Sequence, residues 1–131
     1  MTKPVHMMIR VLDADRSLDF YQRAFDLHVA GRFTFDDFEL IYFSDKDGGF
    51  EIELTVNRGR TQAYNLGDGY GHVAFVVDDL NSEHARFERE GLRPGPIREM
   101  QWNGKPFGKL FFVQDPDGYK IEVLQKFGRF Q

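Results

Sequence analysis

The sequence has no cysteine among its 131 residues. This absence excludes disulfide bonds, a catalytic thiolate and cysteine-ligated zinc. Any metal site must therefore be built from histidine and carboxylate side chains. The four histidines of the chain are His6, His28, His72 and His84.

Apolar runs of membrane length and an excess of positive charge are also missing. No stretch reaches the length of about 18 apolar residues that suggests a transmembrane helix, and the polar N-terminus has no secretory signal. The net charge is −4, whereas nucleic-acid-binding domains carry a basic excess or a basic stripe. We therefore expect a cytoplasmic globular protein that binds neither nucleic acid nor membrane, with residues 1–131 forming a single domain.

The chain carries the same plan twice. Each half holds a histidine followed by an apolar, strand-like run, and further along an Asp-Gly pair followed by Ile-Glu. The spacing from histidine to glutamate is 47 residues between His6 and Glu53 and 50 residues between His72 and Glu122. Two similar spacings between the same two residue types indicate an internal repeat.

Two modules follow from this repeat. We place them at about 4–57 and 70–126, with a polar linker at 58–69. The linker is too short to separate independent domains, so we expect the two halves to share one sheet.

Residue periodicity predicts the same elements in both modules. Helices are expected from Asp15 onward, capped by Asp13 or Asp15, and over 79–90. The segment 98–109 and His28 are interpreted as loops. The expected strands cover 5–11, 36–43, 50–56, 73–77, 110–113 and 119–124. A strand, a helix and further strands, found twice in this order, predict the α+β class.

Strand alternation places four polar residues on one face of the predicted sheet. The apolar residues that alternate with them would face the helices, which leaves the polar face uncovered. The four residues are His6, Glu53, His72 and Glu122. Two imidazoles and two carboxylates that converge there can bind a divalent cation, and four such ligands suit an octahedral ion with two positions left for water or substrate.

Taken singly, each of these residues has a plainer explanation. A histidine or glutamate on a strand is usually a partly solvated polar residue, and it is the recurrence in both halves that favours the metal site. His84 is interpreted as a residue of the helix surface or of helix–sheet packing. Glu51 shares the polar face but is expected at its rim, since Lys120 stands at the corresponding place in the second module.

The motifs around these residues resemble those of glyoxalase I, a family of the vicinal oxygen chelate superfamily. The resemblance extends from His6 to about Gln125. Its motifs are HMMIRV at 6–11, RSLDFY at 16–21, IELTVN at 52–57, YGHVA at 70–74 and DPDGYKIE at 115–122. The last motif is common to many members of the superfamily, whereas IELTVN and YGHVA are more specific to glyoxalase I.

The resemblance implies a fold and an assembly. It implies two tandem βαβββ modules that form a cupped mixed sheet, with the helices on the outer face. It also implies a homodimer with metal sites between the chains. Each site would combine ligands of both chains, namely His6 and Glu53 from one and His72 and Glu122 from the other. Because a histidine stands at position 6, the resemblance favours Ni²⁺ or Co²⁺, with Zn²⁺ as a further candidate.

The resemblance also implies an activity. A metal-dependent glyoxalase I isomerises the hemithioacetal of glutathione and methylglyoxal to S-lactoylglutathione through an enediolate. Glu122 would move the proton, with Glu53 on the other side of the substrate. Arg10 and Asn57 would hold the γ-glutamyl end of the glutathione cosubstrate. Strand alternation agrees, because each of these two residues lies four positions beyond an expected metal ligand, on the same face.

One departure from the family pattern and several alternatives stay open. Some relatives have a basic residue four positions before the second histidine to hold the glycine carboxylate of glutathione, whereas this chain has Asp68. Arg98, Lys105 or Lys109 could supply that cation. The alternatives are another metalloenzyme of the same scaffold, such as a dioxygenase, a thiol transferase or an epimerase, or a non-enzymatic protein that binds small molecules.

Overall fold

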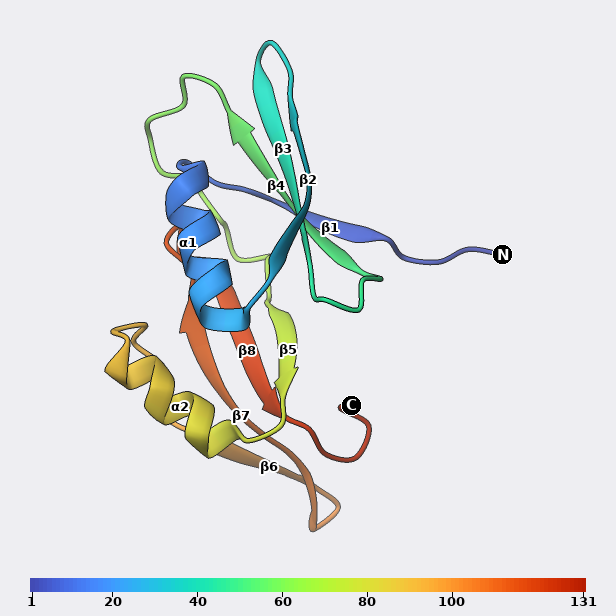
Figure 1. The fold of residues 1–131 in the computed structure, drawn as a ribbon. Helices are drawn as coiled ribbons and strands as arrows, with labels where there is room; N and C mark the ends of the chain where they lie inside the picture. Colours follow the sequence, from blue (N-terminus) through green and yellow to red (C-terminus); the bar gives the residue numbers. More distant parts are fainter. The chain divides into compact units, whose positions relative to one another are not determined.

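The computed structural model describes all 131 residues and divides them into two compact units, Met1–Asn65 and Leu66–Gln131. The boundary between the units falls inside the predicted linker. Each unit has the element order β-α-β-β-β (Figure 1), so the predicted repeat and the α+β class are confirmed. No helix in the structure is long and apolar enough to cross a membrane.

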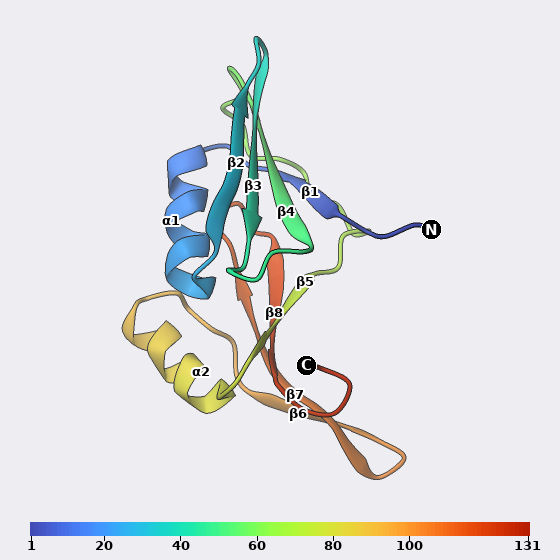
Figure 2. The same ribbon diagram turned by 45° about the vertical axis from the view of Figure 1, so that its right-hand side comes forward.

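The first unit consists of one helix and four strands. They are β1 (His6–Arg10), α1 (Ala14–Phe25), β2 (His28–Thr34), β3 (Phe38–Ser44) and β4 (Glu51–Asn57). The strands form a mixed sheet in the order β1-β4-β3-β2, in which β1 runs parallel to β4 and the other neighbours are antiparallel. The helix α1 lies against one face of this sheet (Figure 2).

The second unit repeats this arrangement. Its elements are β5 (Val73–Val77), α2 (Leu80–Arg89), β6 (Arg98–Trp102), β7 (Lys105–Gln114) and β8 (Lys120–Gln125). The strand order is β5-β8-β7-β6, again with the first and last strands of the unit parallel. The helix α2 contacts β7 and β8.

Both helices begin after an aspartate that caps the free N–H groups of the first turn. The Asp13 carboxylate accepts from the backbone N–H of Arg16, and the Asp79 carboxylate accepts from that of Ser82, each at 3.1 Å. Of the two predicted candidates, Asp13 is therefore the cap of α1, and Asp15 lies in the first turn. Such a cap stabilises a helix by about 1 kcal/mol.

The core of each unit is formed by apolar residues predicted to face the helices, such as Ile52 and Ile121, whereas Val5, Met7 and Phe50, which were predicted to share that face, are exposed. Leu54 is fully buried, and the ring of Tyr21 on α1 lies 5.6 Å from that of Phe43 on β3. In the second unit the ring of Phe87 on α2 lies 5.3 Å from that of Phe111 on β7. The helix-facing side of each sheet is therefore apolar, and the polar residues of the strands point to the opposite side.

The interpretation of 98–109 as a loop is wrong. Arg98–Trp102 forms β6 and Lys105 begins β7, and the two strands make a hairpin. Its two-residue turn, Asn103-Gly104, has φ values of 51° and 74°, and such positive values are required by a type I′ hairpin turn. Because β6 is an edge strand that is exposed along its whole length, it lacks the alternation by which a half-buried strand is recognised.

Two further expectations are corrected by the structure. His28 is not a loop residue but the first residue of β2, which is also an edge strand and is exposed at nearly every position. The two halves do not share one sheet, since hydrogen bonds join the strands into two four-stranded sheets, one in each unit. Each module supplies a complete set of four strands, so neither sheet needs a strand from the other half.

Candidate metal centre

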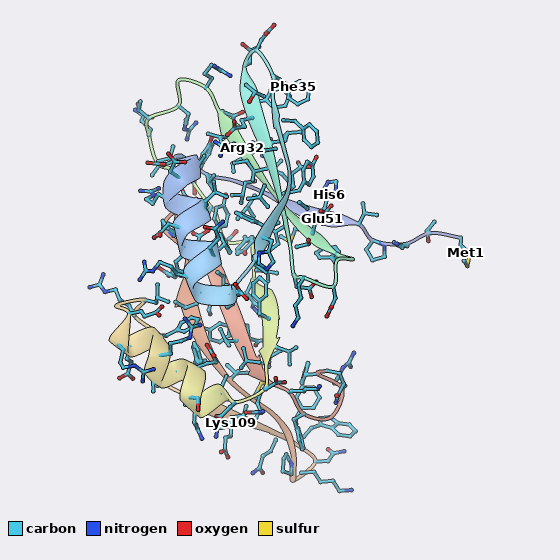
Figure 3. All side chains as sticks on the ribbon, in the orientation of Figure 1. Met1, His6, Arg32, Phe35, Glu51 and Lys109 are labelled. Atoms are coloured by element: carbon cyan, nitrogen blue, oxygen red, sulfur yellow. The ribbon has the colours of Figure 1, made fainter.

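His6 and Glu53 come together in the first unit. The Nε2 atom of His6 lies 3.3 Å from Oε2 of Glu53. In the parallel pairing of β1 with β4 the Cα partner of His6 is Glu51, so the imidazole reaches two residues along β4 to its carboxylate. The His6 side chain is 37% exposed and that of Glu53 is 12% exposed. His6 and Glu51, labelled in Figure 3, lie on the side of the sheet away from α1.

His72 and Glu122 form the equivalent pair in the second unit. Nε2 of His72 lies 3.6 Å from Oε1 of Glu122. Glu122 is the Cα partner of Ala74 in the parallel pairing of β5 with β8, and His72 directly precedes β5. The imidazole is again the more exposed side chain of the two, at 39% against 15%. The sequence repeat is thus a repeat of the same contact between an imidazole and a carboxylate.

The separation in the first pair lies in the range of neighbouring ligands around a single cation, and that in the second pair is slightly longer. Donor atoms that lie about 2.1 Å from an ion are about 3.0 Å apart at a right angle and about 3.4 Å apart at the tetrahedral angle. The pairs are at 3.3 and 3.6 Å. No group of three or more histidine, aspartate or glutamate side chains in the chain is placed so that it could hold a metal ion. Each unit therefore supplies one nitrogen and one oxygen donor, and the donor types suit a borderline divalent ion such as Ni²⁺, Co²⁺ or Zn²⁺.

The aromatic neighbours of the two pairs differ. Tyr42 on β3 is the Cα partner of Glu53, and its ring meets the His6 ring edge-on at 5.7 Å between centroids. A hydrogen bond to Glu53 is the main cause that raises the pKa of the Tyr42 hydroxyl above its usual value, followed by burial and by the negative charges of Glu53 and Glu51. In the second unit the corresponding residue is Phe112, which has no hydroxyl.

Phe112 contacts the ring of His72 and the ammonium group of Lys120. It is the Cα partner of Glu122, and its ring lies 5.4 Å from that of His72. The ammonium group of Lys120 lies 4.0 Å from the centre of the Phe112 ring, which is a cation–π distance. The first pair therefore has a hydroxyl beside its carboxylate, and the second pair has an aromatic ring capped by a cation.

Sequence patterns alone do not single out Tyr42 and Phe112. Both lie in predicted strands, but only the register between the strands places each one opposite a glutamate. The signal that could have identified them is the repeat itself, because both residues precede an Asp-Gly turn and a candidate glutamate in the chain.

The two residues expected to hold the cosubstrate lie at strand ends of the first unit. Arg10 is the exposed last residue of β1, and Asn57 is the last residue of β4. The Asn57 side-chain amide donates to the hydroxyl of Tyr64 at 3.0 Å, and the guanidinium of Arg60 lies 4.3 Å from the centre of the Tyr64 ring. Tyr64 and Arg60 belong to the linker, where no periodicity could have indicated this role.

The remaining histidines do not join either pair. His84 on α2 makes a hydrogen bond with the carbonyl of Gly95 at 2.7 Å through Nε2, and its ring lies 5.0 Å from that of Phe111. Its role is therefore helix–sheet packing, one of the two predicted for it. His28 is an exposed residue of β2. Glu51 is half-buried and stands opposite His6, whereas Lys120 at the matching place is exposed.

Comparison with known proteins agrees with the resemblance found in the sequence. Residues 3–123 match the Glyoxalase/Bleomycin resistance protein/Dioxygenase superfamily. The chain is 36% identical over 129 residues to a lactoylglutathione lyase of Neisseria meningitidis serogroup A, covering 93% of this chain and 89% of that protein. It is also 36% identical over 132 residues to a probable lactoylglutathione lyase of Synechocystis, covering 92% and 93% of the two chains.

A solved structure gives the same result. The trypanothione-dependent glyoxalase I of Leishmania major has a TM-score of 0.77 to this chain and is 32% identical, covering 96% of this chain and 88% of that one. Because identities above 30% extend over about nine-tenths of both partners, the chain belongs to the Glyoxalase/Bleomycin resistance protein/Dioxygenase superfamily and, within it, to the lactoylglutathione lyase (glyoxalase I) family.

Proposed function

We propose that the protein is a metal-dependent glyoxalase I, which isomerises the hemithioacetal of glutathione and methylglyoxal to S-lactoylglutathione. The observation that carries this proposal is the repeated contact of an imidazole with a carboxylate, at 3.3 and 3.6 Å, in a chain of the lactoylglutathione lyase family. The two carboxylates also favour glyoxalase I over a dioxygenase, whose iron site uses two histidines and one carboxylate.

The proposed site holds one divalent ion, with Ni²⁺ or Co²⁺ favoured and Zn²⁺ as the third candidate. Its ligands are His6, Glu53, His72 and Glu122, the four residues that form the two pairs. When bound, the ion supplies Lewis-acid stabilisation of the negative charge that develops on the two neighbouring oxygens of the substrate.

The isomerisation moves two protons within the substrate. The proton on C1 of the hemithioacetal goes to C2, and the hydroxyl proton on the oxygen of C1 goes to the oxygen of C2. The transfer between the two carbons needs a base beside them. We assign this role to the Glu122 carboxylate, which accepts the C1 proton and then donates the same proton to C2, so that it ends the cycle ionised. In this proposal Glu53 lies on the other side of the substrate. There it stays a metal ligand or acts as the base for the opposite stereoisomer of the hemithioacetal.

The cosubstrate is proposed to be glutathione, held at its γ-glutamyl end by Arg10 and Asn57. A guanidinium can bind a carboxylate through two parallel hydrogen bonds, and the Asn57 amide is already oriented by Tyr64. Asp68, exposed in the turn at 67–69, would repel the glycine carboxylate of glutathione. A thiol whose glycine carboxylate is amidated is therefore the second candidate, and the similar enzyme from Leishmania major is trypanothione-dependent.

We further propose a homodimer in which each metal site combines one pair from each chain. Each unit supplies two ligands. A twofold axis would bring the first pair of one chain to the second pair of the other chain, and it would do so at two equivalent sites. The proposed compartment is the cytoplasm, because a reaction that begins with a free thiol needs a reducing environment. Fractionation that finds the protein outside the cytoplasm would contradict this placement.

Removal of both histidines should abolish metal binding. In His6→Ala/His72→Ala each pair loses its nitrogen donor, and the two remaining carboxylates make a poor site for Ni²⁺ or Co²⁺. Metal content after dialysis, measured by mass spectrometry, is expected to fall from about one ion per chain to near zero. His28→Ala is the matched control, and it should keep its metal. A full metal content in the double variant would contradict the proposed set of ligands.

Replacement of Glu122 by glutamine should stop the chemistry and spare the metal. The amide oxygen can still coordinate, but it cannot take the C1 proton, so kcat should fall by about 10²–10⁴ at saturating metal. Lactoylglutathione formation is followed by thioester absorbance, with Ni²⁺, Co²⁺ and Zn²⁺ added in turn. Glu51→Gln, at the rim of the same face as Glu53, is the control.

The outcomes of this assay separate the alternatives. Normal turnover in Glu122→Gln with metal bound would assign the proton transfer to Glu53 or to another base. Wild-type protein that binds metal without isomerase activity would indicate another metalloenzyme of the same scaffold. Wild-type protein that binds no metal would indicate a non-enzymatic binding protein.

Mixing two inactive variants should restore activity if the sites are shared between chains. In a hybrid of His6→Ala and Glu122→Ala chains, both defects fall in one site and the other site is intact. After random subunit exchange, about one quarter of the wild-type activity is expected. No recovery, with hybrids demonstrated by native mass spectrometry, would mean that each chain carries a complete site.

Arg10→Ala should raise KM for the hemithioacetal about tenfold and leave kcat little changed, because the contact is remote from the bonds that change. The same rise is expected with glutathione and with glutathione amidated at its glycine, since both share the γ-glutamyl end. Arg23→Ala on α1, where the arginine pairs with Asp19 at 3.2 Å, serves as the control. An unchanged KM would remove Arg10 from the binding site.

A further inference from the structure

The two pairs are alike in their ligands and unlike in what stands beside the carboxylate. On β3 the residue opposite Glu53 is Tyr42, and on β7 the residue opposite Glu122 is Phe112. Both rings meet the histidine of their own pair edge-on, at 5.7 and 5.4 Å. The hydroxyl group is therefore the difference between two positions that are otherwise equivalent in register and ring contact.

The Tyr42 ring is held from two sides. The His6 ring meets it on one side, and the Phe33 ring lies 6.1 Å away with its edge toward it. Phe33 can fold back over β2 because residue 31 is glycine, where a Cβ atom would lie only 2.8 Å from the Phe33 ring. Tyr42 stands directly opposite Glu53 in the antiparallel pairing of β3 with β4, where the Cβ atoms of such pairs lie about 4.5–5.5 Å apart, so hydroxyl and carboxylate share one face of the sheet. The raised pKa of Tyr42, with a hydrogen bond to Glu53 as its main cause, agrees with this placement.

The surroundings of Glu122 are different. The position opposite Glu122 has no hydroxyl to donate to its carboxylate, and the face of the Phe112 ring is occupied by the Lys120 ammonium at 4.0 Å. The contact of Glu122 with His72 is 3.6 Å, longer than the 3.3 Å of the first pair. The second carboxylate thus has fewer restraints than the first.

We propose that Tyr42 is a positioning residue, whose hydroxyl donates to Glu53 and fixes that carboxylate as a metal ligand, and that the phenyl ring at position 112 leaves Glu122 free to move with the substrate proton. The inference rests on the proposed function. Groups that hydrogen-bond to a metal ligand orient it, and their loss typically weakens metal binding by about 10–100-fold. The difference between tyrosine and phenylalanine at these positions thus gives Glu53 the role of a fixed metal ligand and Glu122 that of the mobile base, although the two glutamates are equivalent in the repeat.

Two reciprocal variants test this proposal, namely Tyr42→Phe, which removes the hydroxyl, and Phe112→Tyr, which adds one opposite Glu122. The metal dissociation constant is measured by competition with a chelator, and the ligand geometry by the visible absorption spectrum of the Co²⁺ form. Tyr42→Phe is expected to weaken metal binding about tenfold and to change the Co²⁺ spectrum. At saturating metal its kcat should stay within a few-fold of wild type, because Glu122 is untouched.

Phe112→Tyr should give the opposite pattern. Metal binding should be unchanged or tighter, and kcat should fall, because the new hydroxyl restrains the carboxylate that must move. Tyr21→Phe removes a hydroxyl on the helix-facing side of the first sheet and is the control, with metal binding expected to equal that of wild type. Circular dichroism and thermal melting establish that each variant is folded.

The failure of this inference can be told apart from the failure of the proposed function. If wild type binds metal and isomerises the hemithioacetal while Tyr42→Phe has the same dissociation constant and Co²⁺ spectrum, the positioning role of Tyr42 is overturned and the function stands. An unchanged kcat in Phe112→Tyr overturns the proposal that the phenyl ring at position 112 leaves the Glu122 carboxylate free to move. If wild type binds no metal, the proposed function fails and the inference fails with it.

Discussion

The parallel pairing of the first and last strands in each unit is the constraint on which the polar site depends. β1 and β4 are about as far apart in the sequence as the module allows, yet they are neighbours in the sheet, as are β5 and β8. Parallel strands need a crossover connection between them, and here the helix and two antiparallel strands fill it. The histidine at the start of each unit and the glutamate near its end meet only because these strands pair.

The same pairing explains why the histidine of each pair stays exposed while its carboxylate is enclosed. The helix of each unit covers the apolar side of its sheet, and alternation directs the other side chains away from it. Glu53 and Thr55 are buried although they are polar, since they lie on a central strand with neighbours on both sides. His6, the partner of Glu53 on the edge strand β1, is more exposed. Each pair thus joins an enclosed carboxylate to an imidazole that is open to solvent.

Much of this architecture could be predicted from the sequence, for reasons that particular residues make clear. The central strands were predictable because residues such as Ile52 and Leu54 alternate with polar neighbours, and the helices because Asp13 and Asp79 mark their starts. The edge strands β2 and β6 could not be predicted in this way, since exposure on both faces removes the alternation. The Asn103-Gly104 turn was the one local sign of β6.

The pairing of each histidine with its glutamate was predictable because the repeat supplies an internal check that a single sequence otherwise lacks. The partners of the carboxylates were not, because strand register decides them. A shift of one residue between β3 and β4 would replace Tyr42 opposite Glu53 by a core residue, and no sequence pattern fixes that register by itself. The role of Tyr64 could not be predicted either, since this residue lies in a linker without periodicity and acts through its contact with Asn57.

The hairpin of β6 and β7 has a consequence for spectroscopy. The single tryptophan of the chain, Trp102, is the last residue of β6 and is 68% exposed. Indole emission from this protein therefore comes from one solvated strand end, and a loosening of either helix–sheet core leaves that environment much as it was. A blue shift of the emission would instead report that something has covered the tip of the hairpin, which makes Trp102 a built-in optical probe of this one surface.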